Sequence, residues 1–262
     1  MSSPPLLADR QGRVLSLVLN RPEAANAFNV SLITHLEAAL AEATADPEVA
    51  VVVMGSALDS VFSAGMDAKE SIVTDDTFLG LLRLQWSLEA FPKPLVAALV
   101  GHVIGGGAEV ALSADIRIGR EDTRFVFPAT SYGLVQGTWH LVDIVAASWA
   151  REIVLTGRPV LAEEALRLGL LHEIHQDPLA RAGEVAAAVS ERSPRALIEV
   201  KRLFLAAAGR SMEERFRQEN EVNERMRNDP DTRQRFQARF GAGGKPAASP
   251  GSTDDAIQKD ET

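Results

Sequence analysis

The chain of 262 residues contains no cysteine. It therefore cannot hold a disulfide framework, a zinc–thiolate site or a cysteine nucleophile. Long apolar runs are also lacking, because the longest candidate, Leu95–Val100, has the length of a strand rather than of a membrane span. Residues 1–11 carry no apolar segment of the signal-peptide type. These absences predict a cytoplasmic protein with no membrane partner.

The chain has fewer basic than acidic residues, with 27 Lys and Arg against 36 Asp and Glu and a net charge of −9. A general polyanion binder normally presents a basic face, so nucleic acid, RNA included, is disfavoured as a partner. A small anionic ligand is not excluded, because backbone N–H groups and one or two basic side chains can bind it locally. Hydrophobic residues make up 46 % of the chain, enough for a sizeable core.

Strand and helix patterns alternate along the chain. Continuous β-branched runs and short alternating runs predict strands, and leucines recurring at helical spacing predict helices. The predicted strands are Val14–Leu19, Val49–Met54, Leu95–Val100, Ile116–Ile118 and Phe125–Phe127, and the predicted helices are about Val30–Ala45, Thr77–Glu89 and Ala108–Ser113. The order predicts an α/β fold. The glycine patterns of dinucleotide-binding and P-loop folds are absent from the sequence.

The C-terminal part reads as helical up to about Phe240. Ser193-Pro194 suits a helix start, Ser211 and Glu214 have capping-box spacing, and Asp229-Pro230 precedes a last short helix. Residues 241–262 have almost nothing to bury and are predicted to be disordered.

Two glycine-bearing stretches, Phe62–Lys69 and Gly101–Glu109, each follow a predicted buried strand. Glycine leaves backbone N–H groups uncovered, and Gly105-Gly106-Gly107 directly precedes a helix whose dipole favours negative charge. Either stretch alone is more often a packing feature than a site. Their pairing about forty residues apart favours two N–H groups that converge on one oxygen, which is an oxyanion hole.

Several further segments accompany these stretches in unbroken order over roughly residues 8 to 240, and together they resemble the crotonase (enoyl-CoA hydratase/isomerase) superfamily. The segments that carry the resemblance are Asn20-Arg21-Pro22, Asn26-Ala27-Phe28, Phe62–Lys69, Pro92–Ala98, Gly105–Glu109, Ala114–Ile118, Leu155–Arg158, Glu164-Ala165, Leu168–Leu170 and Ser193–Ala196.

The resemblance implies a crotonase-like spiral of ββα turns with a C-terminal helical trimerisation region. We expect a core over residues 1–194, a helical oligomerisation region over 195–240 and a tail over 241–262. The family assembles as a homotrimer or a dimer of trimers. Its members act on an acyl-CoA or acyl-carrier-protein thioester, often in fatty acid metabolism, and the resemblance implies neither a prosthetic group nor a metal.

The resemblance also assigns roles to residues. The N–H groups of Met66 and Gly106 would hold the thioester carbonyl as it becomes an enolate, and Glu109 would be a catalytic glutamate. Contacts with coenzyme A would come from Ala24, Ala64 and Met66, mostly through the backbone. Lys69 and Arg21 are candidate phosphate partners.

One departure from the family pattern concerns the second catalytic glutamate, expected after Pro128, where this chain has Ala129. A methyl group cannot transfer a proton, so four alternatives stay open: hydration by other means, a one-carboxylate double-bond isomerisation, decarboxylation, or acyl-CoA binding without catalysis. Candidates for the lining of the substrate pocket are His102, Ala129, Tyr132, Gln136, Trp139 and His140.

Overall fold

The computed structural model describes residues 3–241, and its internal contacts divide the chain into two units, Met1–Ala206 and Ala207–Thr262. The division lies later than the boundary after residue 194 that the sequence suggests. All but the first residue of the predicted tail, 241–262, lies outside the described residues. An oligomerisation role for 195–240 stays a prediction.

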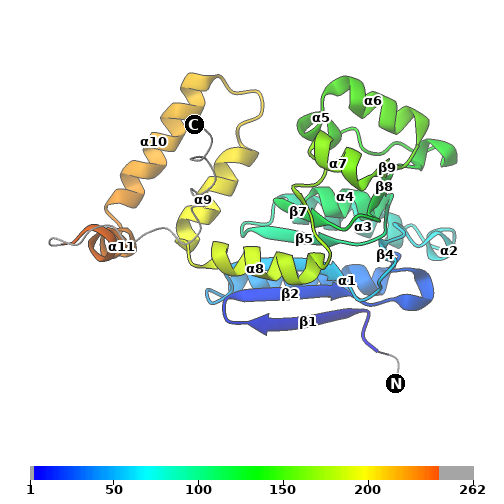
Figure 1. Ribbon diagram of the computed structural model, residues 1–262, viewed down its shortest axis with the longest axis horizontal. Helices are drawn as coiled ribbons and strands as arrows, with labels where there is room; N and C mark the ends of the chain where they lie inside the picture. Colours follow the sequence, from blue (N-terminus) through cyan, green and yellow to red (C-terminus); the bar gives the residue numbers. More distant parts are fainter. Residues whose placement is uncertain (1–2, 242–262) are drawn as a thin grey trace, which may run out of the picture. The chain divides into compact units, whose positions relative to one another are not determined.

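The first unit contains two sheets (Figure 1). The larger has six strands in the order β1-β2-β3-β5-β7-β10, and the smaller has four in the order β4-β6-β8-β9. The strands are β1 (Leu6–Gln11), β2 (Val14–Leu19), β3 (Val51–Ser56), β4 (Val61–Ser63), β5 (Leu95–Leu99), β6 (His102–Ile104), β7 (Ile116–Gly119), β8 (Arg124–Val126), β9 (Val160–Leu161) and β10 (Glu173–Ile174).

The chain winds between the two sheets in repeated turns. β3, β5 and β7 pair in parallel in the large sheet, and the strand after each of them, β4, β6 and β8, pairs in parallel in the small one. Helices connect these strand pairs, so the predicted ββα turns and the mixed α/β class are confirmed. The segments that leave the small-sheet strands β4 and β6 for the next helix contain Gly65 and Gly105, so the two glycine stretches lie at the ends of neighbouring strands.

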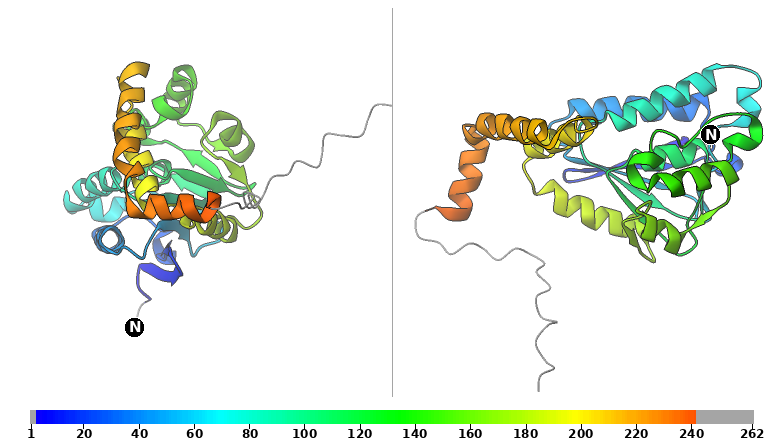
Figure 2. Two further views of the ribbon diagram at one scale, coloured as in Figure 1. Left: turned by 90° about the vertical axis from the view of Figure 1, so that its left-hand side faces the viewer. Right: turned by 90° about the horizontal axis from the view of Figure 1, so that it is seen from above.

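Helices cover both faces of the large sheet (Figure 2). α8 (Pro178–Ser190) packs on one face and α1 (Val30–Ala45), α3 (Asp76–Glu89) and α4 (Gly106–Leu112) on the other. Side chains alternate between the two cores along β3, where Val52 and Met54 face α1 while Val51 and Val53 face α8. This period of two explains why the strand reads as a continuous apolar run.

The predicted strands and helices named above are all present, with ends shifted by one or two residues. The structure adds elements that the sequence did not suggest. β1 forms an antiparallel hairpin with β2 through Gly12, whose φ of 59° suits a tight turn. The other additions are α2 (Ala68–Ser71), α5 (Leu141–Ile144), α6 (Ala147–Thr156), α7 (Ala162–Leu168), α8 and the strands β4, β6, β9 and β10.

α9 (Pro194–Leu205) ends the first unit, and α10 (Met212–Arg227) and α11 (Pro230–Phe240) form the described part of the second. The start of α10 has the capping box that the sequence predicts, with Ser211 and Glu214 each bonding the other's backbone N–H. Between residues 3 and 241 no helix is long and apolar enough to cross a bilayer.

Candidate functional site

The two glycine stretches meet at one edge of the small sheet. A Cβ placed on Gly65 would lie 2.8 Å from the carbonyl oxygen of Ile104 and 3.1 Å from the nitrogen of Gly106. A Cβ placed on Gly106 would lie 3.6 Å from the nitrogen of Met66. The structure therefore brings the backbone nitrogens of Met66 and Gly106, which the sequence singles out, to the same place.

Neither of these two N–H groups donates to another described residue. Met66 lies opposite Phe28 in a parallel bridge whose hydrogen bonds use the residues on either side of Met66. The N–H of Phe28 donates to the carbonyl of Gly65 at 2.7 Å, and the N–H of Asp67 donates to the carbonyl of Phe28 at 2.9 Å. Gly106 is the first residue of α4, where a helix has no internal acceptor for its N–H. Two free donors at one spot are suited to a negatively charged oxygen.

Each glycine of the triplet Gly105–Gly107 is required at its position for a different structural reason. Gly105 has a φ of 56° and Gly65 across from it a φ of 90°, a region that side chains with a Cβ rarely adopt. Gly107 packs so closely on β4 that a Cβ would come within 2.7 Å of the Cβ of Ser63. At Gly106 the Cβ would meet a side chain of α3, Leu81, at 2.5 Å.

Glu109 lies one helical turn into α4 with its side chain only 3 % exposed. Its Oε1 accepts the N–H of Gly137 at 2.7 Å, and its Oε2 lies 2.6 Å from Nδ1 of His140. Each carboxylate oxygen keeps a second lone pair, so the group can still accept a proton from a ligand or from water.

The ring of His140 lies between Glu109 and a second carboxylate, Glu89, whose Oε2 is 3.1 Å from Nε2. Trp139 stacks on the ring at 3.6 Å between centroids. Burial lowers the pKa of His140, but hydrogen bonds to Glu109 and Glu89 and their charges outweigh burial and hold the pKa above its ordinary value.

Arg117 on β7 holds the far end of α4. Its guanidinium donates to the carbonyls of Leu112 and Ala114 at the end of α4 and to Leu170 and Gly169 beyond it. Burial lowers the pKa of Arg117 to about 10, against the opposing charges of Asp115 and Glu89. The cation therefore remains charged at neutral pH and stabilises the helix end.

The predicted pocket residues fall into two groups. Gln136 and His140 join the site: the amide of Gln136 is 4.0 Å from a Cβ placed on Gly105. Ala129 lies half-buried in the 3-10 helix η2 (Ala129–Tyr132), while Tyr132 in the same helix is 76 % exposed. His102 is exposed on β6. Trp139, 38 % exposed, reaches the site only through its stacking on His140.

The residues predicted to contact coenzyme A lie beside the Met66 loop. Ala24 is in the 3-10 helix η1 (Pro22–Ala24), and the N–H of Ala64 donates to the carbonyl of Ala25 at 3.0 Å. Lys69 is exposed on α2. Arg21 is engaged internally with the carbonyl of Ala27 and with Asp67, so it is not a free phosphate partner as the sequence suggested.

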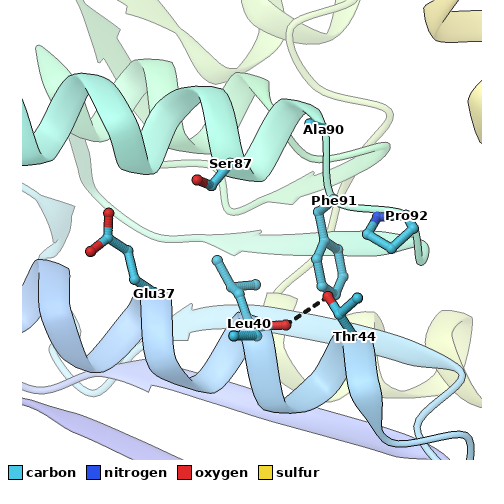
Figure 3. A pocket seen from close by; sticks show the side chains of 8 residues that line it. Glu37, Leu40, Thr44, Ser87, Ala90, Phe91 and Pro92 are labelled. Atoms are coloured by element: carbon cyan, nitrogen blue, oxygen red, sulfur yellow. Dashed lines mark hydrogen bonds between the residues drawn. The ribbon is translucent and has the colours of Figure 1, made fainter.

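A hollow of about 370 Å³ lies elsewhere, between α1 and the end of α3 (Figure 3). Leu40 and Phe91 form its floor and Glu37 its rim. It contains none of the residues predicted for the site. We regard it as a packing groove between two helices.

Comparison with known proteins agrees with this geometry. A model of the family described as enoyl-CoA hydratase/isomerase matches residues 9–241. The chain belongs to this family. The 2,3-dehydroadipyl-CoA hydratase of Escherichia coli is 37 % identical over 205 residues, which cover 75 % of this chain and 80 % of that protein.

Solved structures confirm the crotonase-like fold. An enoyl-CoA hydratase from Thermoplasma volcanium superposes with a TM-score of 0.82 at 27 % identity and covers 90 % of this chain and 97 % of its own. An enoyl-CoA hydratase from Bacillus anthracis superposes with a TM-score of 0.85 at 24 % identity, covering 89 % and 95 %. The second likeness concerns the fold alone.

Sequence reasoning missed two residues around Glu109: Gly137, which donates to its carboxylate, and Glu89, which bonds the ring of His140 on the side away from Glu109. Gly137 was one of many glycines, and only the fold shows where its N–H points. Glu89 had a recognisable signal, because it is the last residue of α3, where the helix dipole disfavours a carboxylate. An acid at a helix C-terminus needs a compensating cation, which here is His140.

Proposed function

We propose that this member of the enoyl-CoA hydratase/isomerase family is an enzyme that acts on an acyl-CoA thioester through an enolate. The N–H groups of Met66 and Gly106 hold the thioester oxygen, and Glu109 transfers a proton at the acyl chain or orients water. The observation that carries the proposal is the meeting of these two unpaired N–H groups beside a buried carboxylate.

The physical reason is differential stabilisation. A thioester carbonyl is neutral in the ground state and gains negative charge as the enolate forms, so two fixed donors bind the transition state more strongly than the substrate. One such donor typically lowers the barrier by about 2.7–4 kcal/mol. The dipole of α4 acts in the same direction because Gly106 is its first residue.

Ala129 favours reactions that need one carboxylate. His140 is the one ionisable side chain that bonds Glu109 among the described residues, and the methyl group of Ala129 adds no second proton donor. We therefore place double-bond isomerisation or decarboxylation beside hydration, with the same oxyanion hole in each. In decarboxylation the loss of CO₂ generates the enolate, so that reaction depends least on Glu109.

Coenzyme A would lie along the Met66 loop. The carbonyl of Ala64 is available to an adenine amino group, Ala24 lies in the neighbouring 3-10 helix, and Lys69 offers an exposed cation for phosphate. An acyl-carrier-protein thioester would present the same carbonyl to the same N–H groups but would not need an adenine contact. Weakened binding of acyl-CoA in Lys69→Ala would support coenzyme A.

Assembly into a homotrimer or a dimer of trimers is part of the proposal. α9 leaves apolar side chains exposed, with Phe204 at 78 %, Val200 at 50 % and Leu205 at 47 %. A helix with such a face in one chain is suited to burial against a second copy. Light scattering of the purified protein distinguishes monomer, trimer and hexamer, and Phe204→Lys is expected to shift the distribution to smaller species.

The test is a mass-spectrometric screen in D₂O with short, branched and aromatic enoyl- and malonyl-type CoA thioesters, run in parallel on Glu109→Gln. We expect product formation or deuterium gain, lost in the variant for hydration and isomerisation and largely kept for decarboxylation. Binding without turnover or exchange across the panel would contradict the proposal and leave an acyl-CoA-binding protein.

A further inference from the structure

Three ionisable side chains from three parts of the fold form a line behind the oxyanion hole. Glu109 comes from α4, Glu89 from the end of α3, and His140 from the turn before α5. Their side chains are 3 %, 27 % and 6 % exposed. Carboxylate, imidazole and carboxylate follow one another at 2.6 Å and 3.1 Å.

The two distances involve both ring nitrogens. Nδ1 faces Glu109 and Nε2 faces Glu89. A neutral imidazole has one N–H, whereas an imidazolium has two. Only the protonated ring can therefore donate to both carboxylates, and it also supplies the positive charge that the buried Glu109 and the partly buried Glu89 need.

We propose that Glu89 and His140 are positioning residues, in which Glu89 holds the ring of His140 and His140 holds the carboxylate of Glu109 in place for proton transfer. The proposal rests on the role given to Glu109 above. It adds two residues that do not touch the substrate and act only through Glu109.

The carboxylate of Glu109 is fixed at both oxygens. Gly137 N–H donates to Oε1 at 2.7 Å while His140 holds Oε2. Two donors on different oxygens set the plane of the group as well as its position. A carboxylate held in this way presents the same free lone pair to a bound thioester at each encounter, which lowers the cost of orientation in the transition state.

The surroundings of the ring contain no other base or acid that takes over this role. From α4, Ser113 Oγ lies 3.4 Å from Nε2 and donates to the carbonyl of Glu109. Trp139 covers one face of the ring. Arg117 is the nearby permanent cation, and its charge acts on Glu89. In the described part of the chain, no group of His, Asp and Glu is arranged to hold a metal ion.

Deprotonation of the ring would break the arrangement. With one N–H left, a ring lone pair would face a carboxylate, either that of Glu109 or that of Glu89. In the first case the repulsion would release Glu109 directly, and in the second it would release the ring that orients Glu109. Activity should therefore fall on the alkaline side as His140 loses its proton, at a pH above the ordinary range of histidine because the pKa of His140 is raised.

The experiment follows deuterium exchange at the α-carbon of an acyl-CoA as a function of pH, with butyryl-CoA as the first probe and the fastest-exchanging thioester of the screen as the second. Glu89→Gln keeps the size of the side chain and an acceptor oxygen but removes the charge. We expect its alkaline limb to move down by about one pH unit. The exchange rate below the limb should stay within about twofold of wild type.

His140→Gln keeps a donor to Glu109 but removes the charge and the titration. We expect a loss of about tenfold or more in the exchange rate and no alkaline limb. The matched control is Glu37→Gln on α1, whose carboxylate is 31 % exposed and pairs only loosely with Arg83 at 3.7 Å. Its pH profile should coincide with that of wild type.

Since His140 is buried, the rates of His140→Gln are interpreted only if circular dichroism shows native helix content. The result for Glu89→Gln is sufficient to test the proposal without it. An alkaline limb unmoved in Glu89→Gln, or a rate lowered by one factor at every pH, would overturn the positioning role. The proposed function would still stand after such a result, provided that the wild type catalyses exchange and Glu109→Gln does not. No exchange by the wild type with either probe, together with no product from any thioester of the screen, would overturn both.

Discussion

The substitution Gly106→Ala tests the oxyanion hole without removing any hydrogen-bond donor. The added Cβ would lie 3.6 Å from the nitrogen of Met66, next to the space where the thioester oxygen must sit between the two N–H groups. It would also come within 2.5 Å of Cδ2 of Leu81, the far end of a flexible side chain. The variant should therefore fold and bind its substrate poorly in the reactive geometry.

The two effects have different magnitudes. Displacing Leu81 is an overpacking cost of about 1–3 kcal/mol in the free energy of unfolding. Losing the effect of one oxyanion donor is worth about 2.7–4 kcal/mol, or 10²–10³-fold in kcat. Gly106→Ala should thus lose most of its activity at temperatures where it remains folded.

The assay pairs urea unfolding with kcat on the thioester identified by the screen. The control is Gly183→Ala in α8, where a Cβ would meet nothing within 4 Å. That variant should be neutral or more stable by about 0.5–1 kcal/mol because alanine favours the helix, with activity unchanged. Gly106→Ala with wild-type kcat would refute the assignment of Gly106.

Three further predictions concern other parts of the chain. Burial, followed by the charge of Arg117, lowers the pKa of His172, so the unfolded chain takes up this proton at a higher pH than the folded chain does. The contribution of neutral His172 to stability is complete above about pH 6.5 and is lost as the pH falls. In His172→Gln, the free energy of unfolding in urea should therefore change less between about pH 5 and 7 than in the wild type. Ser211→Ala removes the capping box of α10 and should cost about 1 kcal/mol of helix stability, seen as earlier loss of ellipticity in urea, whereas an unchanged curve would mean that the cap is not needed. Ala129→Glu should raise hydration of an enoyl-CoA by about 10²-fold, measured as loss of enoyl absorbance, and no gain would show that the position does not face the substrate.

The sequence predicted the elements whose pattern is local. α1 and α3 carry leucines at helical spacing, and β3 and β5 are apolar on both faces, so periodicity predicts their type, and their ends to within two residues. β9 and β10 have two residues each and exist only because β8 and β7 pair with them. No periodicity can be read from two residues.

The site residues likewise divide into those that a local motif identifies and those that only the fold brings together. Met66, Gly106 and Glu109 lie in motifs and could be named in advance. The partners of Glu109, Gly137 and His140, lie about 30 residues after it, and Glu89, the second partner of His140, lies 20 residues before it; the winding of the chain between two sheets brings them together. Arg21 shows the opposite case, since a basic residue that a matching motif offers as a phosphate partner already forms an ion pair with Asp67 in the fold.

The central claim is that the N–H groups of Met66 and Gly106 polarise a thioester carbonyl. Difference infrared spectroscopy of an acyl-CoA labelled with ¹³C at the carbonyl measures this directly. Because two N–H donors weaken the C=O bond, binding should move the carbonyl stretch to lower frequency in the wild type and in Glu109→Gln, and the shift should be largely lost in Gly106→Ala. A bound thioester whose stretch stays at its frequency in water, or shifts equally in Gly106→Ala, would contradict it.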